Sequence, residues 1–307
     1  MNTRGRTVGI IVARMGSSRV PGKTMLDING ISVIERIIRN VRCASGLDSL
    51  IVATTSHPRD DAIEEASSRL GINCHRGDPE NVLDRVFVAA LSEDADVIVE
   101  IGGDCPFIGP DVLEPAIEYF HSNDYDYLSN YDPPTYPEGF DINIITIKAL
   151  ARAYKDALAP SQRIHPFSYL SFHPSLFKIG NAEYPGEDLS RFHWSLDFPE
   201  DITFIRRVYH LLGDTLPSII GILDCIERDE ELKLMHNQLL RPPSNHAFWS
   251  APSIIRDMNK DIASLAHAAI DLLEDDRFND SHRVYLEMNN ILAELIRFSD
   301  FRKGIKE

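Results

Sequence analysis

Three cationic side chains lie within one span of ten residues near the start of the chain: Arg14, Arg19 and Lys23. They surround a loop of small residues, Gly16–Ser18, in which backbone amides can approach an anion without obstruction by side chains. Positive charge beside free N–H groups is typical of a polyphosphate site, and we predict that function for this loop. The alternative is a strand-to-helix turn whose basic residues are solvated.

Two aspartates follow later strands and could complete such a site. Asp104 stands in GGDCP, and Asp197 stands in WSLDFPED. A carboxylate that faces a phosphate-binding loop favours a divalent cation between them, and Mg²⁺ is usually held by one or two carboxylates together with substrate phosphates. The alternatives are a turn residue for Asp104 and a helix cap before Pro199 for Asp197. We expect Glu200 and Asp201 to serve the dipole of the helix that follows.

The elements that must position these residues alternate between strand and helix. Buried strands are expected at Val8–Val12, Leu50–Thr54, Ile72–His75 and Asp96–Ile101, with helices over Ile34–Ala44, from Asp60–Asp61 and from Pro79. Such alternation predicts a parallel sheet with right-handed crossovers, in which ligands bind at the carboxyl ends of the strands. The turns after Ala13, Thr54, His75 and Ile101 should therefore share one face.

The pattern is looser beyond Ser122. Asp124–Phe140 is rich in Tyr, Pro and Asp and is interpreted as a long functional loop. The segment Ser161–Phe177 carries two His-Pro pairs and is expected to cross the mouth of the site. Further elements are a strand at Ile142–Ile147, a helix near Ala149–Ala157, a last sheet strand at Ser190–Ser195 and a helix beginning near Pro199.

From about Ser218 the sequence is typical of helices only, with a break at Arg241–Ser244. Two helices after the break carry narrow apolar stripes, which predict a helical hairpin. This hairpin could fold back on the core or pair with another subunit, and we expect the second, a homodimer. The stripe residues are Ile255, Met258, Ile262, Leu265, Ala269 and Leu272, then Tyr285, Met288, Ile291, Leu292 and Leu295.

Composition and charge argue against several classes of partner and location. The 307 residues carry a formal net charge of -16, which disfavours nucleic acid and anionic membrane surfaces. No stretch approaches the roughly 18 apolar residues that a membrane-spanning helix needs, and residues 1–7 lack the apolar segment of a signal peptide. The four cysteines form no CxxC pair, so we expect free thiols and a cytoplasmic protein.

The segment Ala13–Lys23 contains the pattern AxxGSxRxPxK, which resembles the nucleotide-binding signature of the sugar cytidylyltransferases. That family includes the CMP-sialic acid and CMP-Kdo synthetases, and the resemblance is strongest to the group of the spore-coat polysaccharide biosynthesis protein F. It covers roughly residues 5–240. Four further blocks agree in order: ATTSHPRDD at Ala53–Asp61, RGDPENVLDR at Arg76–Arg85, GGDCPFIGP at Gly102–Pro110 and LDFPED at Leu196–Asp201.

The resemblance implies an α/β, glycosyltransferase-A-like fold: a mostly parallel sheet flanked by helices, here with a C-terminal helical extension. It implies CTP as donor and Mg²⁺ as cofactor, held by Asp104 and Asp197. Arg14, Lys23 and Asp104 would be the catalytic residues. The implied nucleotide site comprises Ala13, Arg14, Gly16, Ser17, Ser18, Arg19, Lys23, Ala53, Thr54, Arg76 and Asp104.

The sequence departs from the spore-coat group on the acceptor side. That group often has a glutamate after Gly-x-Asp-x, where this chain has Asn143, and often reads Glu-His-Val-Thr where this chain has Ile164-His165-Pro166-Phe167. We therefore expect the nucleotide site to be intact and the acceptor to differ. The candidate acceptor-binding residues are Tyr136, Asp141, Asn143 and His165.

These interpretations give a nucleotidyltransferase domain over 1–240 and a helical extension over 241–307. The expected activity is transfer of CMP from CTP to an acidic sugar or related acid, nonulosonate-like or a phosphonate, with release of pyrophosphate for cell-surface glycan synthesis. One alternative is a glycosyltransferase or other-nucleotide transferase, for which Asp124-Tyr125-Asp126 is the nearby Asp-x-Asp candidate. Another is a non-catalytic nucleotide-binding module.

Overall fold

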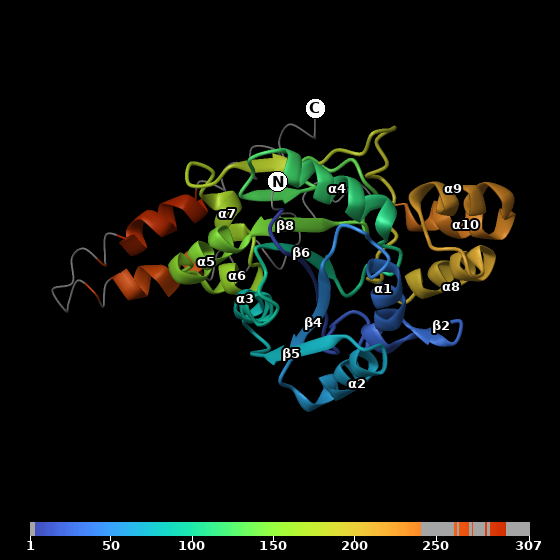
Figure 1. The fold of residues 1–307 in the computed structure, drawn as a ribbon, viewed down its shortest axis with the longest axis horizontal. Coiled ribbons are helices and arrows are strands. Elements are labelled where there is room, and N and C mark those ends of the chain that lie inside the picture. The colour runs from blue at the N-terminus through green and yellow to red at the C-terminus, as the bar shows by residue number, and fades with distance from the viewer. Residues whose placement is uncertain are drawn as a thin grey trace.

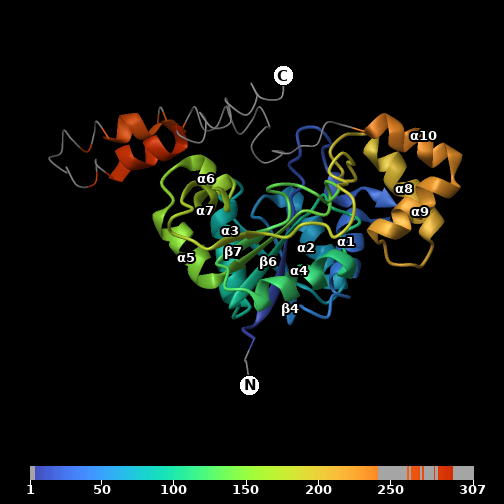
Figure 2. The same ribbon diagram turned by 90° about the horizontal axis from the view of Figure 1, so that it is seen from above.

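The structure is a computed structural model that describes residues 4–240, 261–262, 264–269, 272, 280 and 283–292. A seven-stranded sheet in the order β5-β4-β1-β6-β8-β7-β9 forms its centre, and helices cover both faces (Figures 1 and 2). The strands are β1 Thr7–Val12, β4 Ser49–Thr55, β5 Asn73–Gly77, β6 Val97–Gly102, β7 Tyr127–Ser129, β8 Ile142–Thr146 and β9 Ile179–Asn181. A separate two-stranded hairpin consists of β2 Asp27–Ile28 and β3 Ile31–Ser32.

The helices follow the alternation that the sequence predicts. Those of the sheet region are α1 Val33–Val41, α2 Asp61–Arg69, α3 Val82–Ser92, α4 Pro110–Ser122, α5 Ile147–Asp156, α6 Pro160–Ile164 and α7 Ser168–Phe172. A group of three further helices lies at one side of the sheet (Figures 1 and 2): α8 Asp201–Leu212, α9 Ile219–Arg228 and α10 Glu230–Leu239. Single 3₁₀ turns stand at Lys23–Met25 and Pro58–Asp60.

The sheet is parallel from β5 to β6 and mixed beyond it. β4 and β6 pair in parallel with β1, whereas β8 is antiparallel to β6 and β7 is antiparallel to β8. Val12 lies opposite both Ala53 and Gly102, so the ends of the three central strands meet at one edge. The mostly parallel sheet flanked by helices confirms the expected fold class.

The sheet is held by two apolar layers, one on each face. Ile11, Val52 and Val99 face the layer that contains α1 and α4, while Ile10 and Ile98 face the layer that contains α3 and α5. Each fully buried side chain of this size contributes about 1.5–3 kcal/mol relative to exposure. These rigid layers fix the strand ends from which the site is built.

Helix α1 shows how the sequence encodes this packing. Ser32 and Glu35 form a capping box, in which the Ser32 backbone N–H donates to the Glu35 carboxylate at 3.1 Å. The side chains spaced three and four apart on its inner face have no exposed surface: Ile34, Ile37, Ile38 and Val41.

Several expected boundaries are wrong. Ser190–Ser195 is not a sheet strand, because its backbone bonds mainly to the irregular segment around Glu138, through Trp194 N–H to Glu138 O and Glu138 N–H to Phe192 O. The last strand to join is instead β9, and the segment expected to be a loop contains the short strand β7. Helix α3 begins three residues after Pro79, because the Asn81 side chain accepts from Asp84 N–H and caps it.

The described part of the C-terminal extension packs on α6 and α7. Leu265, Val284 and Ile291 are buried against Ala159 and Phe172. Polar contacts accompany this packing, since Gln162 donates to Glu287 and His173 Nε2 lies 3.1 Å from the other Glu287 oxygen. These residues therefore fold back on the core, which is the alternative that we did not favour.

Two residues of the expected apolar stripe, Tyr285 and Leu292, are 55% and 47% exposed, so they take no part in the packing on α6 and α7. The break at Arg241–Ser244 and the stripe residues Ile255, Met258 and Leu295 lie outside the described residues. Homodimerisation stays a prediction.

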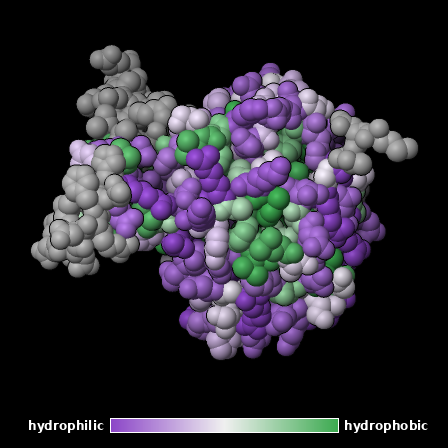
Figure 3. Space-filling view, turned by 60° about the vertical axis from the view of Figure 1, so that its left-hand side comes forward, coloured by the Kyte–Doolittle hydropathy of each residue, from purple (hydrophilic) through white to green (hydrophobic). Residues whose placement is uncertain are grey.

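Among the described residues, no helix is both long and apolar enough to cross a membrane. Hydrophilic residues cover most of the face shown in Figure 3, and hydrophobic residues gather near its middle.

Candidate functional site

A cavity of about 430 Å³ opens at the carboxyl ends of β1 and β6. The small-residue loop forms one wall, α3 and the end of α6 form another, and the turn after β6 forms the floor. The residues that line it are Val12, Ala13, Arg14, Gly16, Ser17, Ser18, Arg19, Lys23, Thr24, Val82, Arg85, Glu100, Gly102, Gly103, Asp104, Ile164 and His165.

The Lys23 ammonium joins the two aspartates that the sequence singled out. Its Nζ lies 2.7 Å from Asp104 Oδ2 and 3.3 Å from Asp197 Oδ1, although these residues are 81 and 174 positions away in the chain. It also donates to the Leu196 carbonyl at 2.8 Å. Burial alone would lower the pKa of Lys23, but the two carboxylates outweigh it and raise the pKa.

Asp197 is the more enclosed carboxylate, with a side chain only 11% exposed. Arg19 donates to its Oδ1 at 2.7 Å, and Ser195 Oγ donates to its Oδ2 at 2.9 Å. Burial raises the pKa of Asp197. The charges of Lys23 and Arg19 lower this pKa by more than burial raises it, so the net shift is downward. This carboxylate is therefore held ionised between two cations.

The loop that carries the cations is fixed by hydrogen bonds to its own backbone. Met15 N–H donates to Asp60 Oδ1 at 2.8 Å, and Thr24 Oγ1 donates to the Arg14 carbonyl at 3.0 Å. Gly22 has a φ of 73°, a left-handed conformation that suits glycine where the loop returns to the site. The loop is thus preorganised, as a phosphate-binding loop requires.

Gly103 allows β1 and the floor of the cavity to approach closely. A Cβ at this position would lie 2.7 Å from the Ala13 Cβ and 2.8 Å from the Val12 carbonyl oxygen. The Gly103 N–H donates to that same carbonyl at 2.9 Å. A side chain here would push the loop away from Asp104.

Arg85 is a site residue that sequence reasoning missed. It is only 1% exposed, and its guanidinium donates to the carbonyls of Asp78 and Pro79. Burial and the neighbouring Arg14 lower the pKa of Arg85. Arg14 itself donates to the Pro79 carbonyl at 3.3 Å, so both arginines hold one turn against the cavity. The block RGDPENVLDR contained this residue, but a basic residue in a helix gave no reason to single it out.

Glu100 also lines the cavity and was missed. It accepts a hydrogen bond from Asn143 Nδ2 at 2.8 Å, across the β6–β8 pair. Burial raises the pKa of Glu100 to about 7, although the bond from Asn143 opposes the shift and the charge of Asp104 adds to it. The signal in the sequence was one acidic residue inside the otherwise apolar run VIVEI.

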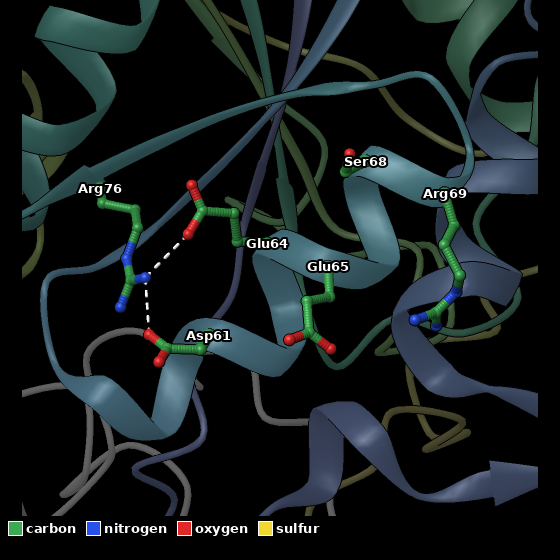
Figure 4. A pocket seen from close by; sticks show the side chains of 6 residues that line it. All are labelled: Asp61, Glu64, Glu65, Ser68, Arg69 and Arg76. Carbon is green, nitrogen blue, oxygen red and sulfur yellow. Dashed lines mark hydrogen bonds and ion pairs between the residues drawn. The ribbon is translucent and has the colours of Figure 1, made fainter.

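Three residues expected around the nucleotide base do not line the cavity. Ala53 and Thr54 are fully buried, and Ala53 contributes only its carbonyl, which accepts from Ala13 N–H at 3.2 Å. Arg76 instead forms ion pairs with Asp61 at 2.7 Å and Glu64 at 2.8 Å, beside a separate open pocket (Figure 4).

The expected acceptor residues lie in different surroundings. His165 lines the cavity, whereas Asn143 reaches it only through Glu100. Asp141 accepts from Gly139 N–H, and burial together with Glu138 raises its pKa to about 7. Tyr136 is buried and packs edge-on against Tyr184.

The Asp-x-Asp segment considered for a glycosyltransferase points elsewhere. Asp124 forms an ion pair with Lys178, and Asp126 accepts from the Lys178 backbone N–H at 2.9 Å. Neither lines the cavity.

The donor set suits a metal that completes its coordination from a substrate. Within the described ranges, no three His, Cys, Asp or Glu residues form a metal cluster. Asp104 and Asp197 instead offer two carboxylates to one central cation, which is Lys23 Nζ in this structure. Mg²⁺ commonly takes one or two carboxylates plus phosphate oxygens and water, so the pair fits Mg²⁺ brought by a polyphosphate.

Comparisons with known proteins show the family of the chain. A family model described as cytidylyltransferase matches residues 8–238. The spore coat polysaccharide biosynthesis protein SpsF of Bacillus subtilis is 28% identical over 216 residues, 67% of this chain and 87% of that protein. The 3-deoxy-manno-octulosonate cytidylyltransferase of Sodalis glossinidius is 26% identical over 252 residues, 76% of this chain and 98% of that protein. A solved cytidylyltransferase structure from Leptospira borgpetersenii matches with a TM-score of 0.72 at 26% identity, covering 78% of this chain and 100% of that one.

Proposed function

Because the chain belongs to the cytidylyltransferase family and is a CTP-dependent nucleotidyltransferase, we propose that it transfers CMP to an acidic sugar or a related acid. The acceptor is a nonulosonate-like sugar acid or a phosphonate, and the product serves cell-surface glycan synthesis. SpsF is named for spore-coat polysaccharide, and the relative from Sodalis is named for a sugar acid, which supports this class of acceptor.

The observation that carries the proposal is the meeting of Asp104 and Asp197 at the Lys23 ammonium. Lys23 and Asp104 line the cavity, and Asp197 lies behind them in contact with Lys23 and Arg19. A turn with solvated basic residues would leave the lysine exposed, but this side chain is only 13% exposed and bonds to both carboxylates. A non-catalytic module has no physical need for such a constellation. Positioned charges around a phosphate are how nucleotidyl transfer is catalysed.

In the proposed reaction an acceptor oxygen attacks the α-phosphorus of CTP in line. A new O–P bond forms, the bond from the α-phosphorus to the bridging oxygen breaks, and pyrophosphate leaves while the acceptor proton passes to solvent. Arg14, Arg19 and Lys23 hold the triphosphate and offset the charge that develops on the leaving group. The amides of Gly16 and Ser18 assist them, whereas the Ser17 N–H already donates to the Met15 carbonyl at 2.9 Å.

Asp104 and Asp197 would hold Mg²⁺. When bound, Mg²⁺ would offset negative charge on the phosphates that react. Lys23 would then give up its two carboxylate contacts and turn its ammonium to the triphosphate.

A pyrophosphate-release assay tests the proposal. Each of CTP, UTP, ATP and GTP is supplied with Mg²⁺ and one of two probe acids, 3-deoxy-manno-octulosonate or a sialic acid. We expect release with CTP and at least one acid, and loss of release in Asp104→Asn, whose side chain keeps the size of the original. Release that depends on another nucleotide contradicts the proposal, and no release with either acid contradicts a sugar acid as the acceptor.

A further inference from the structure

Glu100 is a carboxylate in the cavity that the proposed chemistry does not use. It lies on β6, on the sheet face that α3 and α6 cover, and it lines the same cavity as the phosphate-binding loop. The cations of the site are committed elsewhere, since Lys23 and Arg19 pair with Asp197 and Arg85 bonds to carbonyls. In the part of the chain that the structure describes, no ion pair reaches Glu100.

The described residues give the Glu100 side chain one hydrogen bond, from Asn143, and its direction is fixed. Asn143 Oδ1 accepts from the hydroxyls of Tyr127, at 2.6 Å, and of Tyr131. Its Nδ2 must therefore face Glu100, where it donates to Oε2 at 2.8 Å. Tyr127 is itself locked by stacking on Phe167, with ring centroids 5.7 Å apart and planes 4° apart.

This arrangement leaves the second oxygen of Glu100 to the occupant of the cavity. The described residues provide no hydrogen bond to Oε1, while Oε2 is taken by Asn143. In its ionised form, the Glu100 carboxylate accepts hydrogen bonds and repels phosphate, so it suits neither the triphosphate nor an acidic group of the acceptor. A neutral or cationic group that donates a hydrogen bond is the complementary ligand.

We propose that Glu100, oriented by Asn143, is a specificity-determining residue that accepts a hydrogen bond from a hydroxyl or amino group of the acceptor. This inference rests on the proposed function and deepens it. It assigns the acceptor a hydrogen-bond donor at the floor of the cavity, in addition to its acid group. A site that pairs with such a donor rejects analogues that lack it, because Oε1 would be desolvated without a partner.

The fixed direction of Asn143 allows a nearly isosteric test. In Glu100→Gln the new amide must offer its carbonyl to Asn143 Nδ2, so its NH₂ group faces the cavity and the hydrogen-bond polarity there is inverted. The pair Glu100→Gln with Asn143→Asp restores it. The carboxylate introduced at position 143 would accept from both tyrosines and from the amide introduced at position 100, which leaves the carbonyl of that amide facing the cavity.

The measurement is the KM for each substrate in the pyrophosphate-release assay, with CTP, Mg²⁺ and the two probe acids. We expect Glu100→Gln to raise the KM for the acid by about tenfold to a hundredfold and to leave the KM for CTP within about twofold. The reversed pair should return the KM for the acid to within about threefold of the wild-type value. Glu118→Gln, an exposed position on α4, is the matched control and should change neither constant.

Three results would overturn the inference while the proposed function stands: an unchanged KM for the acid in Glu100→Gln, a rise in the KM for CTP instead, or a reversed pair no better than the single variant. A rise for CTP would place Glu100 against the nucleotide. If the wild-type protein consumes neither acid, the sugar-acid form of the proposed function fails, and the inference falls with it.

Discussion

Replacing Lys23 by methionine removes the cation that joins Asp104 and Asp197. The substitution keeps most of the side-chain volume but deletes three hydrogen bonds, to the two carboxylates and to the Leu196 carbonyl. Two carboxylates then face each other without the ammonium between them. We expect a protein that is less stable without metal and nearly inactive.

The size of the effect follows from burial. Breaking a fully buried ion pair costs about 3–5 kcal/mol, but the Asp104 side chain is 35% exposed, so water compensates and we expect a loss of about 2 kcal/mol. That loss lowers the melting temperature by about 4–8 °C. Loss of one charge-stabilising donor should reduce kcat by about a hundredfold. Because the freed carboxylates suit Mg²⁺, the ion should stabilise the variant more than the wild-type protein.

The same substitution changes the response to acid. Burial raises the pKa of Asp197, but Lys23 and Arg19 lower it by a larger amount. The ionised form of Asp197 therefore stabilises the fold at any pH above the unfolded pKa of about 3.9. This stabilisation is lost as the pH falls through the lower folded pKa. Without Lys23 the folded pKa rises, and the variant should unfold at a higher pH than the wild-type protein.

Thermal melts with and without Mg²⁺, over a range of pH, provide the assay. Lys178→Met is the matched control, because Lys178 pairs with Asp124 on the surface with a side chain 63% exposed, and it should leave the melting temperature nearly unchanged. A Lys23→Met protein that melts with the wild-type protein and keeps its turnover would refute the reasoning.

Two other substitutions test the scaffold of the site. Gly103→Ala should destabilise the protein by about 1–3 kcal/mol and raise the KM for CTP, because the new Cβ would lie 2.7 Å from the Ala13 Cβ. Urea unfolding measures the loss of stability. An unchanged unfolding midpoint together with an unchanged KM would contradict this prediction. Glu287→Gln tests the docking of residues 283–292. Burial lowers the pKa of His173, but Glu287 helps to raise it overall, so this contact stabilises docking below about pH 6.5 and is lost as the pH rises through the folded pKa. In the wild-type protein, the protection of the amides of residues 283–292 from exchange should therefore fall as the pH rises. In the variant this protection should not depend on pH in this way. The same pH dependence in both proteins would contradict the prediction.

The central half of the fold could be predicted from the sequence because its signals are local. Apolar runs such as that of β1, each followed by a turn and a helix, fix the parallel strands and bring their carboxyl ends to one edge. That topology is why Lys23 and Asp104 could be placed together. Asp197 could be assigned to the same site because it follows a segment that ends near the carboxyl ends of these strands.

The remainder depends on contacts that the sequence does not display. The alternation of apolar residues at Phe192 and Trp194 is typical of a strand. Both side chains do face the core, but they do so from an irregular segment. Arg76 follows a strand at the correct edge, but two carboxylates of α2 hold it away from the cavity. Glu100 was overlooked because a single acidic residue in a buried strand does not by itself indicate a site. Its position beside Asn143 and the cavity is visible only in the structure.

The most direct test of the account is the binding of nucleotides, measured by thermal shift with CTP, UTP, ATP and GTP, each with and without Mg²⁺. A ligand present at a hundred times its Kd stabilises the folded state by about 2.7 kcal/mol, which is readily measured. We predict a shift that is largest for CTP, that is enhanced by Mg²⁺ and that falls sharply in Lys23→Met. Equal shifts with all four nucleotides, or no shift with CTP and Mg²⁺, would contradict the assignment of this cavity as the CTP site.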